Sequence, residues 1–217
     1  MFYSIFVILI TITSIMTQTP GAFFITRIQY GGGGDWYADP SSLPNLLEFI
    51  DNQTNIIVDP IEHRSKIGED LFNRSPYLYL TGHGNIRFTE EEAITLRDHL
   101  IAGAFLHADD NYGMDKSFRR EMEKVFPEKE WVELSPDHQI FHIKFDLSSG
   151  LPKVHEHENK RPQALGLFHN ERLVVLYTYE SDLGDGWEDA EVHKDPLETR
   201  TASLQMGTNI IMYALSH

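Results

Sequence analysis

The chain has 217 residues, of which 41% are hydrophobic and 12% aromatic, and it carries a formal net charge of -15. This length and composition predict one globular domain with a single hydrophobic core, and they exclude a disordered chain. The excess of acidic over basic residues argues against a nucleic-acid partner, which needs a clustered cationic surface, and against contact with an anionic lipid surface.

The beginning of the chain is apolar. No residue before Arg27 is charged, and Phe2 to Met16 is almost wholly hydrophobic, which is the length of a signal-peptide core and shorter than a membrane span. We therefore expect an exported protein of the periplasm or cell envelope, with residues 1–22 as a signal peptide and 23–217 as a single α/β domain. Because the start lacks Lys and Arg and residues 17–22 lack a clear cleavage site, an uncleaved anchor remains the alternative and the only expected membrane contact.

The first part of this domain predicts alternating strands and helices. Strands are expected at Phe23 to Tyr30, Asn55 to Asp59, Pro76 to Leu80 and Ala104 to His107, and helices at Ser41 to Asp51, after Thr89, and at Ser117 to Val125. The helix after Thr89 has the residue pattern of a capping box, with Glu92 three positions later. Such alternation favours a mostly parallel sheet with helices on both faces and with ligands at the carboxyl ends of the strands.

The last part of the chain has a different pattern. Ala164 to Phe168 and Leu173 to Tyr179 flank Asn170 and Glu171, which predicts a β-hairpin. Ala202 to Leu215 predicts a closing helix.

Candidate catalytic residues follow two of the predicted strands. His83 lies between two glycines that permit a sharp turn, so it is placed as a general base, as a ligand, or as a turn residue bonded to the backbone. Asp109 and Asp110 follow the strand that ends at His107, on the same expected edge of the sheet. Alternation along a strand sends these two carboxylates to opposite sides, so at most one points into a shared cleft; the alternative is a simple acidic turn.

Several histidines are candidates for a divalent metal such as zinc. His138 and His142 are four residues apart, but Gln139 stands where a zinc protease helix has glutamate. With a carboxylate from Asp109 or Asp110, the candidate ligands are His83, His107, His138 and His142. His155 and His157 form a further pair that predicts either a metal site or a solvated polar loop.

Two segments combine aromatic rings with carboxylates, as ligand-binding loops do. One is residues 179–189, which lack the residue order of a calcium loop and in which Trp187 offers a flat apolar surface. The other follows Gly31 to Gly34, which we expect to form a flexible lid rather than a dinucleotide fingerprint. The candidate ligand-binding residues are Asp35, Trp36, Tyr37, Asn85, Asn111, Tyr112, Glu180, Asp182 and Trp187.

Residues 30–37, 81–85, 103–114, 138–142 and 182–188 together resemble an uncharacterised bacterial family, exported or membrane-associated and common in Bacteroidota. The resemblance covers nearly the whole mature chain. It implies a flavodoxin-like fold similar to class I glutamine amidotransferases and to trehalose-utilisation-like proteins, and it implies no known reaction.

The residue types leave three functions open. The chain has no cysteine, so thiolate-based amidotransferase chemistry is excluded, and no G-x-S-x-G elbow supports a serine hydrolase. The leading expectation is a cleft that binds a small polar or carbohydrate-like ligand. The alternatives are a metal-dependent hydrolase that uses a His/Asp cluster and a non-catalytic envelope scaffold.

Overall fold

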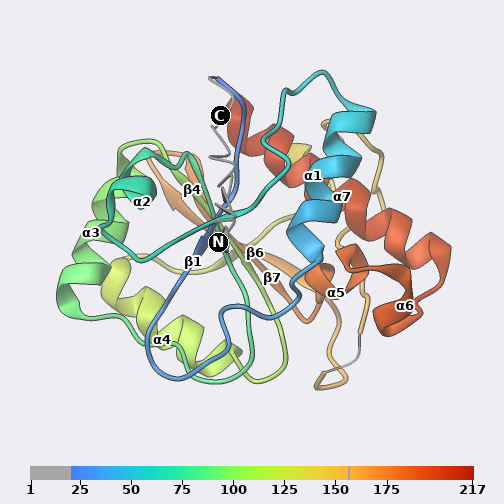
Figure 1. Cartoon of the computed structure of the whole chain (residues 1–217). Helices are drawn as coiled ribbons and strands as arrows, with labels where there is room; N and C mark the ends of the chain where they lie inside the picture. The colour runs from blue at the N-terminus through green and yellow to red at the C-terminus, as the bar shows by residue number, and fades with distance from the viewer. Residues whose placement is uncertain (1–20, 156) are drawn as a thin grey trace, which may run out of the picture.

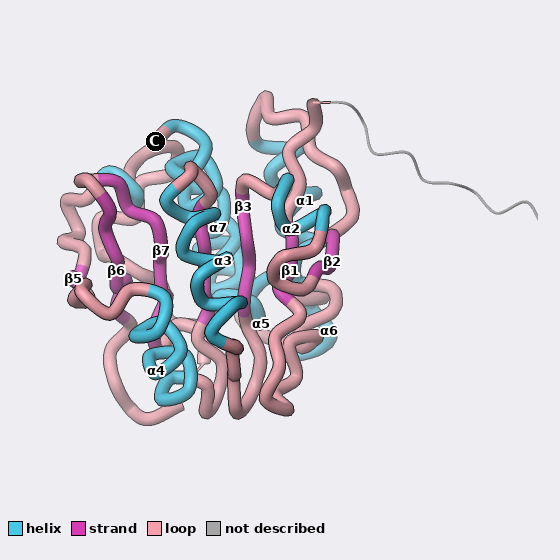
Figure 2. Tube along the Cα trace, turned by 90° about the vertical axis from the view of Figure 1, so that its left-hand side faces the viewer, coloured by secondary structure: helices cyan, strands magenta, loops and turns pink. Residues whose placement is uncertain are grey.

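In residues 21–155 and 157–217, which a computed structural model describes, the fold is built around a seven-stranded sheet in the order β2-β1-β3-β4-β7-β6-β5 (Figure 1). The strands are β1 (Thr26–Ile28), β2 (His63–Ser65), β3 (Tyr77–Leu80), β4 (Phe105–Asp109), β5 (Val132–Glu133), β6 (Gln163–His169) and β7 (Arg172–Tyr179). Neighbours from β2 to β7 pair in parallel, whereas β6 pairs antiparallel with β7 and with β5. The tube in Figure 2 shows the β5–β7 end and the β1–β2 end on opposite sides.

Helices cover both faces of the sheet, as Figure 1 shows. The helices are α1 (Ser42–Gln53), α2 (Asp70–Arg74), α3 (Glu90–Ile101), α4 (Asp115–Val125), α5 (Leu183–Trp187), α6 (Ala190–His193) and α7 (Leu197–Ser216), with a 3-10 turn at Gln139–Phe141. One apolar core includes Leu96 of α3 and Phe118 of α4, and the other includes Leu47 of α1 and Ile210 of α7. The expected mixed α/β fold with a mostly parallel sheet is therefore confirmed.

The helix predicted after Thr89 is α3, and its capping box is present. The Thr89 hydroxyl oxygen accepts from the Glu92 backbone N–H at 3.1 Å, and the Glu92 carboxylate accepts from the Thr89 N–H at 2.7 Å. These two bonds satisfy backbone donors that the helix itself leaves free, which fixes where α3 begins.

The β6–β7 hairpin turns through two residues. Asn170 and Glu171 have φ angles of 47° and 66°, and His169 pairs with Arg172 across the turn. Two successive positive φ angles are typical of a type I′ turn, whose twist suits paired strands. The hairpin places the end of β7 beside the end of β4, and α5 begins four residues after β7.

The prediction of a strand at Asn55 to Asp59 is wrong. In this segment Val58 forms an isolated bridge with Phe23, and the edge strand is β2, at His63–Ser65. The sequence His-Arg-Ser is polar because an edge strand is only partly covered, so apolar runs do not reveal it. The closing helix also begins earlier than expected, at Leu197.

The expected signal peptide or anchor, with its core at Phe2 to Met16, lies outside the described residues. Within the part of the chain that the structure does describe, no helix has both the length and the apolar character needed to cross a membrane.

Candidate functional site

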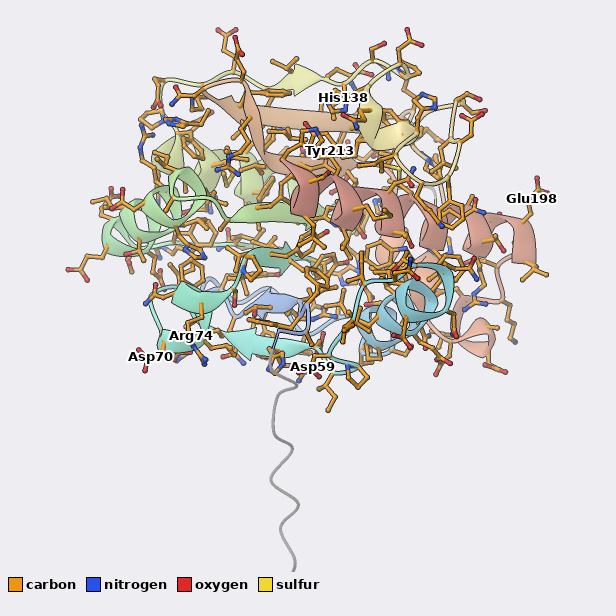
Figure 3. The ribbon with its side chains drawn as sticks, turned by 90° about the horizontal axis from the view of Figure 1, so that it is seen from above. Asp59, Asp70, Arg74, His138, Glu198 and Tyr213 are labelled. Carbon is orange, nitrogen blue, oxygen red and sulfur yellow. The ribbon has the colours of Figure 1, made fainter. Side chains whose placement is uncertain are left out.

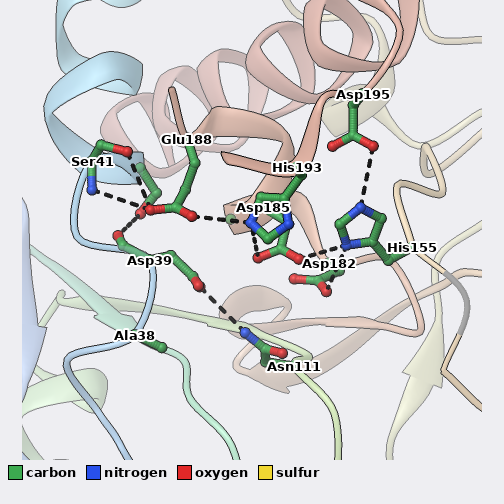
Figure 4. A network of polar contacts seen from close by, with 12 residues as sticks. Ala38, Asp39, Ser41, Asn111, His155, Asp182, Asp185, Glu188, His193 and Asp195 are labelled. Atoms are coloured by element: carbon green, nitrogen blue, oxygen red, sulfur yellow. Dashed lines mark hydrogen bonds and ion pairs between the residues drawn. The ribbon is translucent and has the colours of Figure 1, made fainter. Parts of the chain in front are cut away.

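Histidine and carboxylate side chains gather in segments that follow the carboxyl ends of β1 and β7 and that precede β6, and Figure 4 shows them close together. The loop after β1, the segment before β6 and the residues after β7 each contribute. We call this set the histidine–carboxylate cluster; its members are Asp39, His155, Asp182, Asp185, Glu188, His193 and Asp195.

Asp109 at the end of β4 holds α5 in place. Its carboxylate accepts hydrogen bonds from the Leu183 N–H at 3.2 Å and the Gly184 N–H at 2.6 Å, which are free donors of the first helical turn. A Cβ on Gly184 would lie 3.0 Å from the Tyr79 hydroxyl and 3.2 Å from the Asp109 carboxylate, so a larger residue would require these side chains to shift. Burial raises the pKa of Asp109 well above its usual range. This residue therefore positions Asp185 of α5.

Asp185 lies between two imidazole rings (Figure 4). Its Oδ2 is 2.6 Å from Nδ1 of His155, and its Oδ1 is 3.4 Å from Nε2 of His193. The three side chains each offer a ligand atom, and these atoms lie within 4.8 Å of one another. Imidazole nitrogen and carboxylate oxygen are common ligands of zinc. This arrangement can therefore hold a divalent cation.

Both imidazoles have further carboxylate partners. Nε2 of His155 is 3.2 Å from Oδ1 of Asp195, and Nε2 of His193 is 3.0 Å from Oε2 of Glu188. A carboxylate on the far nitrogen of a metal-binding histidine fixes the ring and its tautomer. Asp195 is placed to act in this way on His155.

Asp182 is the most buried carboxylate of the cluster, with 1% of the residue exposed. Its Oδ2 is 2.9 Å from Nε2 of His157 and 3.7 Å from Nδ1 of His155, whereas its Oδ1 has no hydrogen-bond partner among the described residues. A buried, unpaired carboxylate oxygen is costly unless a cation or an ordered water satisfies it.

The cluster holds protons at neutral pH. The Asp182 and Asp185 carboxylates raise the pKa of His155 to about 9. Burial, together with the charges of Asp182 and Asp39, raises the pKa of Asp185, and burial raises that of Asp39 to about 6. Since protons relieve the repulsion between these carboxylates here, a divalent cation can take their place.

A pocket of about 300 Å³ lies next to the cluster. His157 contributes to its wall and connects it to Asp182 through the 2.9 Å contact. The other residues that line it are Asp110, Tyr112, Gly113, Asp115, Lys116, Glu158, Lys160, Tyr179 and Glu180. The predicted residues Asp110, Tyr112 and Glu180 thus come together.

Asp109 and Asp110 point to opposite sides, as the alternation predicts. Asp110 accepts from the Tyr177 hydroxyl at 2.8 Å and from the Glu180 N–H at 2.7 Å, and it faces the pocket. Burial raises the pKa of Asp110 to about 6. The third candidate catalytic residue, His83, lies outside the cluster, where its Nδ1 is 3.1 Å from Oδ2 of Asp35.

The glycine segment lies against the residues that follow β3. Gly31 pairs with Arg87, and the Asn85 side chain donates to the Gly32 carbonyl at 3.1 Å. A Cβ on Gly32 would lie 2.7 Å from the Asn85 carbonyl oxygen, which explains the glycine. The segment expected to be a flexible lid, Gly31 to Gly34, is therefore held by its contacts with Asn85 and Arg87.

The neighbouring aromatic residues do not form one ligand surface. Trp36 is partly buried under the guanidinium of Arg64, 5.8 Å away, whereas Tyr37 is exposed. Trp187 is fully buried, and its indole N–H donates to the Ser203 carbonyl at 2.8 Å, so the expected ligand platform is a core residue. Asn111 is buried and donates to Asp39 at 3.3 Å, which attaches it to the cluster.

The four histidines expected to bind metal do not gather with one another. His107 is buried between the Tyr77 hydroxyl at 3.2 Å and the Thr178 hydroxyl at 3.0 Å, and burial lowers its pKa to about 3. His138 packs on the ring of Tyr213 (Figure 3), and Nδ1 of His142 is 2.9 Å from Asp146. His83 pairs with Asp35. The structure instead places His155 beside carboxylates.

Three members of the cluster were not singled out from the sequence. Asp39 precedes a proline, a position typical of a turn residue. His193 and Asp195 lie in a polar stretch that follows residues 179–189. The sequence feature that could have indicated these residues is the closely spaced His and Asp residues on either side of residues 179–189.

Fold and cluster together define an α/β domain with a histidine–carboxylate cluster at the carboxyl edge of a mostly parallel sheet. The chain belongs to the family described as "Domain of unknown function (DUF4159)", which matches residues 24–215. The expected membership of an uncharacterised family is confirmed. No curated protein matches the chain.

Proposed function

We propose that this protein is a metal-dependent hydrolase whose divalent cation, zinc by preference, is bound by His155, Asp185 and His193. The observation that carries this proposal is that one ligand atom from each of these three side chains lies within 4.8 Å of the other two. Two histidines and a carboxylate form one of the usual ligand sets of catalytic zinc.

Three protein ligands leave a coordination position for water. A bound divalent cation lowers the pKa of such a water to about 7 and so supplies a nucleophile. Asp182 can orient such a water, since its histidine partners lower its pKa against the opposing effect of burial and keep it ionised, and its Oδ1 can accept a hydrogen bond.

The pocket beside the cluster suits the substrate. Its wall combines carboxylates and lysines with the exposed ring of Tyr112, whose centroid is 6.1 Å from that of His157. Such a lining favours a small polar molecule. Binding of a carbohydrate-like ligand without catalysis is therefore the second candidate function, and this pocket is the observation that favours it.

A flavodoxin-like, amidotransferase-like architecture is part of the proposal. The first five positions of the sheet, β2-β1-β3-β4-β7, follow the strand order 2-1-3-4-5 of flavodoxin-like folds. In those folds, ligands bind at the carboxyl ends of the strands, where the cluster lies. Export to the periplasm or cell envelope completes the proposal and rests on the apolar segment Phe2 to Met16.

The test is zinc-dependent hydrolysis. Metal-stripped protein, with and without one equivalent of zinc, is assayed on p-nitrophenyl acetate, p-nitrophenyl phosphate and an N-acetylated sugar. We expect turnover that requires zinc, that falls at least a hundredfold in Asp185→Asn, and that persists in the control Asp146→Asn on an exposed carboxylate. Zinc binding without hydrolysis would leave the ligand-binding candidate, and equal rates with and without zinc would overturn the proposal.

A further inference from the structure

Asp185 belongs to two groups of metal-ligating side chains at once. It lies with His155 and His193 in one group and with Asp39 and Glu188 in the other, and within each group the ligand atoms are at most 4.8 Å apart. The two groups therefore meet at one carboxylate, which has two oxygen atoms to share.

The second group is acidic and buried. Asp39, Asp185 and Glu188 are each less than 9% exposed. Asn111 donates to Asp39 at 3.3 Å, and the Ser41 hydroxyl donates to Glu188 at 3.2 Å. These donors are neutral, so they hold the carboxylates in place without balancing their charge.

The nearby cations leave the second group with excess negative charge. The Arg27 guanidinium donates to the backbone carbonyl of Asp39 at 3.2 Å, and its Nε is engaged by Glu62 at 2.8 Å. His193 lies 3.0 Å from Glu188 and contacts Asp185 at 3.4 Å. His155 also contacts Asp185, at 2.6 Å, but it is shared with Asp182 and Asp195. Two imidazoles, one of them shared in this way, do not balance the three buried carboxylates.

Asp182 gives an independent indication that the cluster suits a cation. Its buried Oδ1 has no hydrogen-bond partner in the described part of the chain, and Figure 4 shows its carboxylate beside that of Asp185. Its Oδ2 is 3.7 Å from Nδ1 of His155, so Asp182 lies beside the first group. An unsatisfied oxygen at this position fits a cation, or water on a cation, between the groups.

We propose that the cluster is a two-cation centre in which the Asp185 carboxylate bridges a cation on His155 and His193 to a second cation on Asp39 and Glu188. This inference rests on the proposed function, because it shares Asp185 with it. The second set contains oxygen ligands alone, and such a set suits manganese or magnesium rather than zinc. The two positions therefore differ in the metal that they prefer.

A two-cation centre narrows the reaction class. Cations about 3.5–4 Å apart stabilise both the attacking and the leaving oxygen of a displacement. In hydrolysis of a phosphate monoester, the oxygen of a water molecule bonds to phosphorus while that water gives one proton to Asp182. The ester P–O bond breaks on the opposite side of phosphorus, the leaving alkoxide takes up a proton from solvent water, and Asp182 returns its proton to solvent.

The experiment uses manganese as the probe. Full-length, metal-stripped protein is dialysed against Mn²⁺, the bound metal is counted, and electron paramagnetic resonance spectra are recorded. We expect two ions per chain with an exchange-coupled spectrum in the wild type, and one uncoupled ion in Asp39→Asn. Asn tolerates the left-handed backbone at this position, where φ is 54°, so this variant should fold. Glu188→Gln is a second variant with the same expected loss.

The outcomes separate the two proposals. One ion in the wild type that is lost in His193→Ala and kept in Asp39→Asn overturns the two-cation centre and leaves the proposed function standing. Two ions without magnetic coupling overturn the bridge. Absence of bound manganese in every variant, together with absence of bound zinc, overturns both proposals.

Discussion

Nε2 of His155 lies 3.2 Å from Oδ1 of Asp195, on the side of the ring away from the nitrogen that approaches Asp185. A carboxylate in this position orients a metal-binding imidazole and makes it a stronger ligand. The relationship therefore gives Asp195 a role in metal affinity without direct metal contact.

Asp195→Asn should weaken zinc binding about 10- to 100-fold while the fold is retained. The amide still fills the space, but it no longer stabilises the imidazole as a ligand. Competition with a chromophoric chelator measures the affinity, and Glu191→Gln, on the exposed surface of α6, is the matched control. Equal affinity in wild type and Asp195→Asn would remove Asp195 from the site.

Zinc affinity should rise with pH. The cluster raises the pKa of His155 to about 9, so below that pH zinc must displace a proton from this ring. The apparent affinity should then increase about tenfold per pH unit for each displaced proton between pH 6 and 8. Chelator competition at constant ionic strength checks this, and an affinity that does not change with pH would contradict the proton-binding state of the cluster.

His107 should make the wild type sensitive to acid. Burial lowers its pKa to about 3, whereas an unfolded histidine titrates near 6.5. Below about pH 6.5 the unfolded chain therefore binds a proton that the folded chain does not. The free energy of unfolding should fall by about 1.4 kcal/mol per pH unit from this group as the pH drops toward 4.

The variant His107→Gln isolates that contribution. It lacks the titrating ring, so its own stability should depend less steeply on pH than that of the wild type. Urea denaturation at pH 7, 6, 5 and 4 measures both proteins. Parallel stability curves would show that His107 does not titrate as its burial requires.

Thr89→Ala should destabilise the protein by about 1 kcal/mol, because it removes the side-chain cap of α3. Thr89→Ser keeps the hydroxyl and should lose little. Chemical denaturation of both variants gives the difference. Zinc affinity should be the same in both, and a change in affinity would mean that α3 influences the site.

Local patterns could be predicted from the sequence because their partners are close in the chain. The two partners of the Thr89–Glu92 box are three positions apart, and the opposite directions of Asp109 and Asp110 follow from the pleat of a strand. The expected hairpin around Asn170 and Glu171 likewise depends on a short segment.

The cluster could be predicted only in part. The sequence indicated His155 and the acidic segment after β7 as candidates. Asp39 lies in the loop after β1 and His193 ends α6, and only the fold brings these residues together with the candidates. Trp187 shows the converse error, since a tryptophan among carboxylates suggests a surface although α5 turns its ring into the core. A pattern along the chain does not reveal which side of so short a helix is buried.

The most direct test of the account is the zinc content of metal-stripped protein after exposure to zinc and removal of the excess, measured by elemental mass spectrometry on wild type, His193→Ala and the control His142→Ala. We predict that wild type and His142→Ala retain at least one zinc ion per chain and that His193→Ala loses it. Folded wild-type protein that retains no zinc, or a His193→Ala variant that retains as much as the wild type, would contradict the assignment of the site.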